Sequence, residues 1–200
     1  MVAGRLTPRG DNVFSRHPRS ADMRIAVSGA HRTGKTTLVE ELRRALPTYA
    51  VVDEPYYLLE EEGHDFAEMP CLEDFELQLE RSLEATVEGE EDRIFDRCPA
   101  DILAYLITHR DSGGFDVERW LPRVRSAMEP LDLIVFVPIE DPDRVTVSEP
   151  DDAELRRRVD EELREIVLDD RWDLGIEALE VTGTPRERLR QVLAWVRGAR

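Results

Sequence analysis

The chain has 200 residues, of which 41% are hydrophobic and 36% charged, and its formal net charge at pH 7 is −17. This length suits one α/β domain, and no apolar run approaches the roughly 18 residues that a membrane span needs. The acidity argues against nonspecific binding to nucleic acid or to membrane surfaces, because both need a basic footprint. The sequence has no signal-peptide core, disulfide framework or zinc-ligand spacing, so we expect a cytoplasmic protein.

Residues 1–22 carry four arginines among Pro, Gly and Ser and show no hydrophobic periodicity. We expect them to form a disordered leader. Met23 directly precedes the first predicted strand, so the sequence leaves open whether translation starts at Met1 or at Met23. The folded domain is expected over residues 23–200, without a second domain.

The rest of the chain alternates between short apolar runs and segments with helical spacing. Strands are predicted at 24–28, 49–53, 93–96, 131–137 and 178–182. Helices are predicted at 35–46, 72–88, 99–109, 116–128 and 152–168, and a last one after a capping box formed by Thr184, Pro185 and Glu187. This alternation predicts an α/β fold of three layers, a parallel sheet with helices on both faces.

Residues 29–36 read GAHRTGKT and match the phosphate-binding pattern G-x-x-x-x-G-K-T. The match lies between a predicted strand and a predicted helix, as such a loop requires. Glycines let backbone N–H groups turn toward phosphates, and the N-terminus of the next helix adds partial positive charge. We expect the phosphates to be bound by Gly29, Ala30, His31, Arg32, Thr33, Gly34, Lys35, Thr36 and Thr37. An ordinary Gly-rich turn is the less favoured interpretation.

Lys35 is the only lysine among 27 basic residues. Codon bias with one accidental survivor is an alternative explanation. We favour a chemical one, because a compact ammonium on a flexible stem does what a planar guanidinium cannot do. In a phosphate loop, this lysine reaches the terminal phosphates and the Thr36 hydroxyl binds magnesium. The lack of a second lysine also disfavours a GTPase, whose guanine-reading motif contains one.

Carboxylates follow two further predicted strands. Asp96 ends the strand 93–96, where it would hold the magnesium shell, and Arg97 lies next to the expected acceptor or phosphate. Glu54 follows the strand 49–53, and ligands of parallel sheets bind beyond the carboxyl ends of strands, so Glu54 is a candidate general base. The alternatives are a cap or turn residue for Asp96 and a solvated carboxylate for Glu54.

Arginines are concentrated after the fourth predicted strand, where a lid would lie. A lid arginine stabilises the charge of a phosphoryl group in transfer. Our catalytic candidates are Arg144, Arg157 and Arg158, within a run that also holds Arg156 and Arg164. A solvated helix face is the alternative, because acidic residues occur at pairing distances along this helix. The four histidines show no ligand spacing, so we expect no metal other than nucleotide-bound magnesium.

The segments GAHRTGKTT, DEPYYL, FDRCPADILAYL and EVTGTPRERL resemble the P-loop nucleoside and nucleotide kinases. The greatest likeness is to AAA-type ATPase domains similar to ribosylnicotinamide kinase, and more distantly to deoxynucleoside and thymidylate kinases. The resemblance covers about residues 24–197. It implies a five-stranded parallel sheet of order 2-3-1-4-5, a helical lid, and ATP with magnesium as the nucleotide and its metal.

The resemblance also implies roles for single residues. Glu54 would act as the base, and the pair Asp96-Arg97 would handle magnesium and substrate. Gly183 and Thr184 would lie beside the adenine ring, a role that a Gly after the last strand also permits on steric grounds; a simple turn is the alternative. Cys98 stands where nucleoside kinases usually have Ser or Tyr, which leaves the acceptor open.

We therefore expect an ATP-dependent kinase acting on a hydroxyl of a small, nucleoside-like molecule. The alternative is an ATPase that acts as a regulatory or partner-binding switch. Residues 55–92 separate the two: a kinase would line a closed acceptor pocket with Tyr56, Tyr57 and Phe75, and a switch would expose a partner surface. Remodelling ATPases are disfavoured, since Arg97 stands where their catalytic Glu would follow Asp96. A homodimer remains open.

Overall fold

The computed structural model describes residues 23–67, 71–89, 92–109, 112–141 and 150–199. The expected leader, residues 1–22, and Arg144 lie outside the described residues. In the described part, the strands are β1 (Arg24–Ser28), β2 (Ala50–Val52), β3 (Arg93–Asp96), β4 (Leu133–Phe136) and β5 (Ala178–Glu180). All of their pairings are parallel, and their order across the sheet is β2-β3-β1-β4-β5. The predicted fold class and strand order are confirmed.

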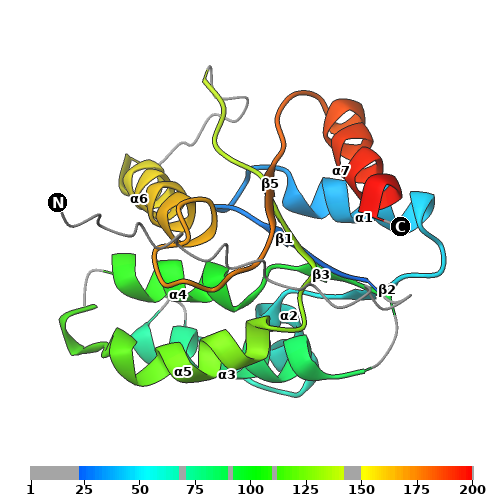
Figure 1. Ribbon diagram of the computed structural model, residues 1–200. Helices are drawn as coiled ribbons and strands as arrows, with labels where there is room; N and C mark the ends of the chain where they lie inside the picture. Colours follow the sequence, from blue (N-terminus) through cyan, green and yellow to red (C-terminus); the bar gives the residue numbers. More distant parts are fainter. Residues whose placement is uncertain (1–22, 68–70, 90–91, 110–111, 142–149, 200) are drawn as a thin grey trace, which may run out of the picture.

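Helices cover both faces of the sheet (Figure 1). The α-helices are α1 (Lys35–Ala45), α2 (Pro55–Glu61), α3 (Leu72–Val87), α4 (Pro99–Thr108), α5 (Val117–Met128), α6 (Pro150–Val167) and α7 (Pro185–Ala199), with a 3₁₀ turn at Ser112–Gly114. The helices α1 and α7 pack on one face, and α3, α4, α5 and α6 form the layer on the other. No helix among the described residues is both long and apolar enough to cross a membrane.

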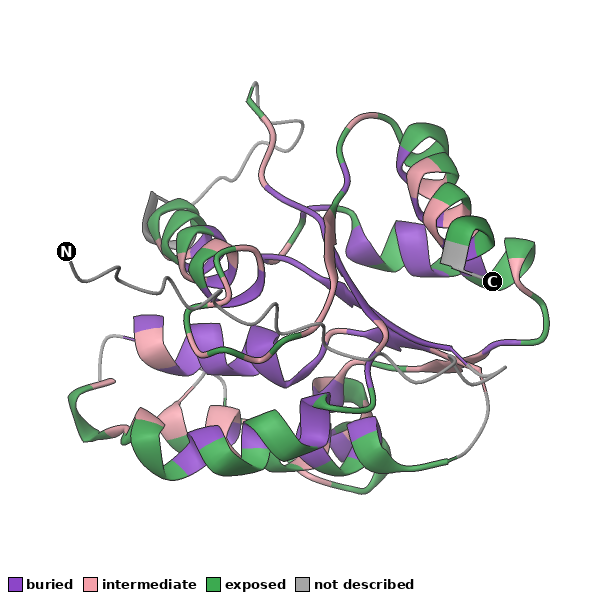
Figure 2. Cartoon of the chain, in the orientation of Figure 1, coloured by how far each residue is buried: buried purple, intermediate pink, exposed green. Residues whose placement is uncertain are grey.

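The core lies between these layers, as the burial colours of Figure 2 show. The central strand β1 is buried along its whole length, because helices cover both of its faces and strands flank both of its edges. The helix α6 contributes Val159, Leu163 and Ile166 to the core, so its described part packs as a layer of the domain.

The sequence prediction omitted α2, a helix of seven residues that begins at Pro55. Two turns are too short to show a hydrophobic period, although Pro at the first helical position is a start signal. The remaining boundaries differ from the predicted ones by a few residues at the ends of elements. The helix α2 directly follows Glu54 and thus forms part of the wall beside the candidate base.

Candidate active site

The phosphate loop, residues 29–36, connects β1 to α1 at the carboxyl edge of the sheet. Gly29 has φ 153°, and a Cβ atom there would lie 2.4 Å from the carbonyl oxygen of Val137. Gly34 has φ 94° and caps α1 in the left-handed conformation. Only glycine adopts these conformations without strain or collision. The two glycines of the motif are therefore fixed by the backbone geometry.

Cationic side chains from four parts of the chain donate hydrogen bonds to consecutive carbonyl oxygens of the loop. The contacts are Arg97 Nη1 to Gly29 at 3.1 Å, Lys35 Nζ to Ala30 at 2.7 Å, Arg156 Nε to His31 at 2.8 Å, Arg156 Nη2 to Arg32 at 3.4 Å, and Arg188 Nη1 to Thr33 at 2.6 Å. The C=O and N–H groups of a peptide point in opposite directions. Holding the carbonyls on cations therefore turns the intervening amides the other way, as an anion-binding nest requires.

Lys35 and Asp96 are both buried beside the loop. Burial, followed by the charge of Arg97, lowers the pKa of Lys35. Burial, followed by the charge of Glu54, raises the pKa of Asp96 against the lowering effect of Lys35, Arg97 and the Thr36 hydroxyl. Both shifts disfavour the charged form of the side chain. A phosphate bound near Lys35 would favour its charged form, and a divalent cation bound near Asp96 would favour the carboxylate.

The candidate magnesium ligands fit a divalent cation. Asp96 Oδ1 is buried and makes no hydrogen bond in the part of the chain that is described, and the Thr36 side chain is exposed at the N-terminus of α1. A carboxylate and a hydroxyl are oxygen ligands of the kind magnesium takes, with phosphates and water completing its shell. Among the described residues, no group of three or more His, Cys, Asp or Glu is arranged to bind a metal without a nucleotide.

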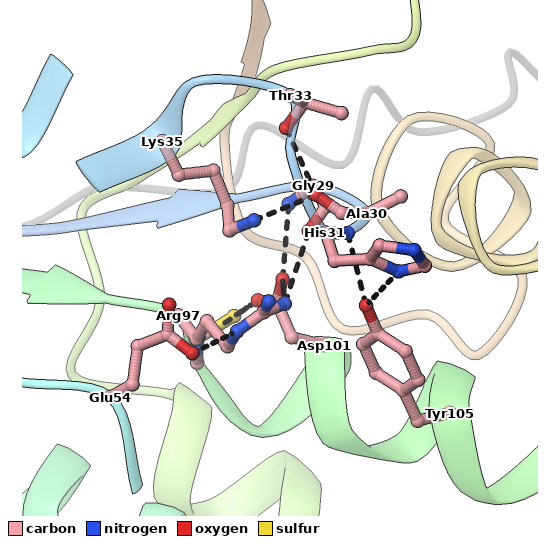
Figure 3. Close-up of polar contacts among 10 residues, drawn as sticks. Gly29, Ala30, His31, Thr33, Lys35, Glu54, Arg97, Asp101 and Tyr105 are labelled. Atoms are coloured by element: carbon pink, nitrogen blue, oxygen red, sulfur yellow. Dashed lines mark hydrogen bonds and ion pairs between the residues drawn. The ribbon is translucent and has the colours of Figure 1, made fainter. Parts of the chain in front are cut away.

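Arg97 links the loop to the candidate base (Figure 3). Its Nε donates to Glu54 Oε2 at 2.7 Å, and its Nη1 lies 3.4 Å from Asp101 Oδ1. Asp101 is fully buried and also accepts from the amides of Gly29 and Cys98, each at 3.0 Å. Arg97 itself has φ 76°, a conformation that a non-glycine residue holds only when its surroundings require it. Glu54 keeps its second oxygen, Oε1, outside these contacts.

A cavity of about 300 Å³ opens next to Glu54 and Arg97. Tyr56 and Phe75 line it, as expected, but Tyr57 does not: its side chain is 55% exposed, because it lies on the outer side of the short helix α2. Tyr105 lines the cavity as well, and its hydroxyl accepts a hydrogen bond from the amide of His31 in the loop at 3.0 Å. One side chain therefore contacts both the loop and this cavity.

A second cavity, of about 320 Å³, is lined in part by the loop itself. Arg32, Thr33, Gly34 and Thr37 form one wall, and Gly183 belongs to another. Thr184 is not among the lining residues: its backbone N–H and its hydroxyl both donate to Glu187 at 2.7 Å, in the predicted capping box. The position of Gly183 agrees with the expected contact to adenine. The adenine contacts of Gly183 and of Thr184 both stay predictions.

A family model described as an AAA domain matches residues 24–188. The chain belongs to this AAA-domain family. No curated protein sequence matches it significantly.

Solved structures similar to this AAA domain include a deoxyadenosine kinase and a thymidylate kinase. Deoxyadenosine kinase from M. mycoides is 13% identical with a TM-score of 0.62, covering 89% of this chain and 100% of that chain. Thymidylate kinase from Candida albicans is 16% identical with a TM-score of 0.59, covering 88% and 92%. NadR, solved in complex with NR, is 19% identical with a TM-score of 0.59, covering 89% of this chain and 50% of that chain. The AAA domain thus has the fold of the P-loop kinases.

The arginines of α6 lie in different environments from those we expected. Arg157 is exposed and pairs with Glu154 and Glu161 on its own helix, and Arg158 is exposed as well. For Arg157 the structure favours the solvated-face interpretation. Arg156 is only 3% exposed and holds two carbonyls of the loop. It precedes the buried Val159 by three residues, so its helical phase was the signal that distinguished it from its neighbours.

Sequence reasoning also missed Asp101, Tyr105 and Arg188 as residues of the site. Asp101 carried one signal: it stands three residues after the N-cap Cys98, the capping-box position, and the structure contains that box. Arg188 Nη2 contacts Glu140 at 3.0 Å, and Glu140 accepts from the amide of Gly183 at 2.5 Å. Nothing in the local sequence relates Arg188 to a loop more than 150 positions earlier.

Proposed function

We propose that this AAA domain is an ATP-dependent kinase that transfers the terminal phosphoryl group to a hydroxyl of a small, nucleoside-like molecule. The observation that carries the proposal is the contact of Arg97 with both the phosphate loop and Glu54, because Arg97 and Glu54 also line a cavity next to the loop. A hydrolase needs a nucleotide site alone. A cavity with a carboxylate beside the phosphates provides a place for an acceptor hydroxyl.

Each residue then has a defined task. Lys35 and the loop amides bind the phosphates, and Thr36 and Asp96 would hold Mg²⁺, which neutralises charge on the phosphate oxygens. Glu54 Oε1 takes the proton of the acceptor hydroxyl, while Arg97 fixes the other oxygen of Glu54 at 2.7 Å. Positioning and electrostatic stabilisation supply most of the catalysis in this kind of reaction.

The test compares Glu54→Gln with the parent protein in an ADP-release assay containing ATP, Mg²⁺ and a panel of nucleosides and sugars. Gln keeps one oxygen that can accept from Arg97, but it cannot take a proton. General base catalysis contributes about 10²–10⁴-fold, so acceptor-stimulated turnover should fall by that factor while calorimetric ATP affinity hardly changes.

The matched control is Asp53→Asn. Asp53 is the neighbouring carboxylate at the end of the same strand, is exposed, and does not line the acceptor cavity. It should leave turnover at the parental level. Stimulation that persists in Glu54→Gln would show that the base lies elsewhere. Absence of stimulation by every acceptor in the parent protein would favour the regulatory ATPase instead.

A further inference from the structure

One carboxylate of the site is fully buried and belongs to the wall of neither cavity. Asp101, on α4, is 0% exposed. It is not among the described residues that line the acceptor cavity or the second cavity. A carboxylate is costly to bury unless donors or a positive charge lie beside its oxygens. What Asp101 does for the site must therefore follow from the groups that it holds.

Both oxygens of Asp101 are used, and every partner is a donor (Figure 3). Oδ1 accepts from the amide of Gly29 at 3.0 Å and lies 3.4 Å from Nη1 of Arg97. Oδ2 accepts from the amide of Cys98 at 3.0 Å and lies 3.5 Å from the Sγ atom of Cys98. Asparagine does not match these partners, because one side of its amide donates instead of accepting. Asp101 thus ties the start of the phosphate loop to Arg97 and to the start of α4.

These contacts hold both polar backbone groups of the first loop residue. Asp101 accepts from the N–H of Gly29, and Arg97 Nη1 donates to the C=O of Gly29 at 3.1 Å. Both contacts lie within the protein, so the start of the loop is held before a nucleotide arrives. Binding to a loop that is already ordered does not cost the entropy of arranging it. Asp101 should therefore contribute to ATP affinity although it does not line the nucleotide cavity.

Asp101 also sets the direction in which Arg97 points. The φ of Arg97 is 76°, a left-handed conformation that a non-glycine residue keeps only where its surroundings require it. Its guanidinium lies between two carboxylates: Nε donates to Glu54 Oε2 at 2.7 Å, and Nη1 faces Asp101. Without Asp101, the guanidinium can turn and pair with both oxygens of Glu54, a geometry that arginine and carboxylates often adopt. Such a pair would occupy Oε1, the oxygen that takes the proton in the proposed reaction.

We propose that Asp101 is a positioning residue with two effects. The first effect is to fix the start of the phosphate loop. The second effect is to keep Arg97 from pairing with both oxygens of Glu54, so that Oε1 stays available as the base. The first effect needs only a nucleotide site. The second rests on the proposed kinase function and names what holds its base ready.

The experiment compares Asp101→Asn with the parent protein, both as the full chain. Calorimetry with ATP and Mg²⁺ gives the affinity, and ADP release with an acceptor that stimulates the parent gives kcat. Each kcat is divided by the number of ATP sites titrated in the same preparation, so partial unfolding does not change it. We expect ATP affinity to fall about 2- to 10-fold. The kcat should fall further, by about 10²-fold, which is the loss caused by displacing a reacting group by about 1 Å.

Asp170→Asn is the matched control. Asp170 also accepts from two backbone amides with its two oxygens, from Leu174 at 2.6 Å and from Gly175 at 3.2 Å. It is not among the described residues that line either cavity. The same substitution therefore removes the same kind of contact outside the site. It should lower Tm and leave kcat and ATP affinity at parental values.

A double-mutant cycle separates positioning from a loss of stability. Asp101→Asn is combined with Glu54→Gln, and kcat is measured for the parent, both single variants and the double variant. If Asp101 acts through Glu54, replacing it in the Glu54→Gln background lowers kcat by no more than about twofold, because the base is already absent. A structural role would make the two losses multiply, and that result would overturn the second effect.

The remaining outcomes test the two effects one at a time. Parental ATP affinity in Asp101→Asn would overturn the first effect, and parental kcat would overturn the second. If no acceptor stimulates ADP release in the parent, the kinase function fails together with the second effect, while calorimetry still tests the first. If Asp101→Asn does not fold, Asp101→Glu takes its place, because it keeps both oxygens and moves them by the length of one CH₂ group. Parental kcat and ATP affinity in Asp101→Glu would then overturn the proposal.

Discussion

Tyr105→Phe keeps the ring in the wall of the acceptor cavity and removes the hydroxyl that contacts the phosphate loop. That hydroxyl accepts from the amide of His31 at 3.0 Å and lies 3.1 Å from the Nδ1 atom of the same residue. Tyr105 is only 8% exposed, so water cannot readily replace the hydroxyl. A partly buried amide deprived of its acceptor costs about 1–3 kcal/mol, which for this chain length lowers Tm by roughly 2–12 °C.

The loop should respond as well, because the lost contact belongs to the segment that we propose binds the phosphates. If restoring its geometry costs about 1–2 kcal/mol of binding free energy, ATP affinity falls about 5- to 30-fold. Thermal unfolding and a calorimetric ATP titration measure the two effects separately. Tyr57→Phe is the control, since that side chain is 55% exposed, and it should match the parent in both. A lower Tm with parental ATP affinity would refute the link between Tyr105 and the loop.

Two further predictions concern opposite ends of the sheet. Lys35→Ala should reduce ATP affinity by at least about tenfold, because each bond to a charged group contributes about 1.5–3 kcal/mol, while the domain stays folded; parental affinity in a calorimetric titration would contradict the phosphate-loop assignment. Arg24→Met should lower the free energy of unfolding by about 2–4 kcal/mol, since Arg24 donates to the carbonyls of Thr86, Glu88 and Gly89 at the end of α3. Its KM for ATP should stay parental in a steady-state assay, and a changed KM would show that the two ends of the sheet are coupled.

The sheet and the phosphate loop were predictable from the sequence because their signals are local. Buried parallel strands are continuous apolar runs, and the loop has fixed spacing. Once the strands are known to be parallel, Glu54 and Asp96 must emerge at the same edge as the loop. The pairings Val27 with Asp96 and Val52 with Phe95 show that they do. The parallel topology alone was therefore enough to predict that Glu54, Asp96 and the loop lie at the same edge of the sheet.

Two of the residues that hold the loop were not predictable in this way, because their partners are backbone carbonyls. A carbonyl leaves no mark in a sequence, so Arg156 and Arg188 looked like other arginines of an arginine-rich chain. Charge pairing along a helix was visible in the sequence for Arg157, and the structure contains such pairs with Glu154 and Glu161. Arg156 and Arg157 differ in which face of α6 they occupy: Arg156 lies on the face toward the core and Arg157 on the exposed face. An argument from charge alone does not include this difference.

Two arginines hold the loop, one at Gly29 and one at Thr33. Each of them also contacts a carboxylate that lines an adjoining cavity. At its start, Arg97 contacts the carbonyl of Gly29 and Glu54 of the acceptor cavity. At its end, Arg188 contacts the carbonyl of Thr33 and Glu140 of the other cavity. A ligand that changes the charge around either carboxylate therefore acts on the same loop. A regulatory ATPase needs a nucleotide site, for which the contacts of Arg188 with the loop and Glu140 suffice. The contacts of Arg97 with the loop and Glu54 are therefore the part of the structure that argues for an acceptor.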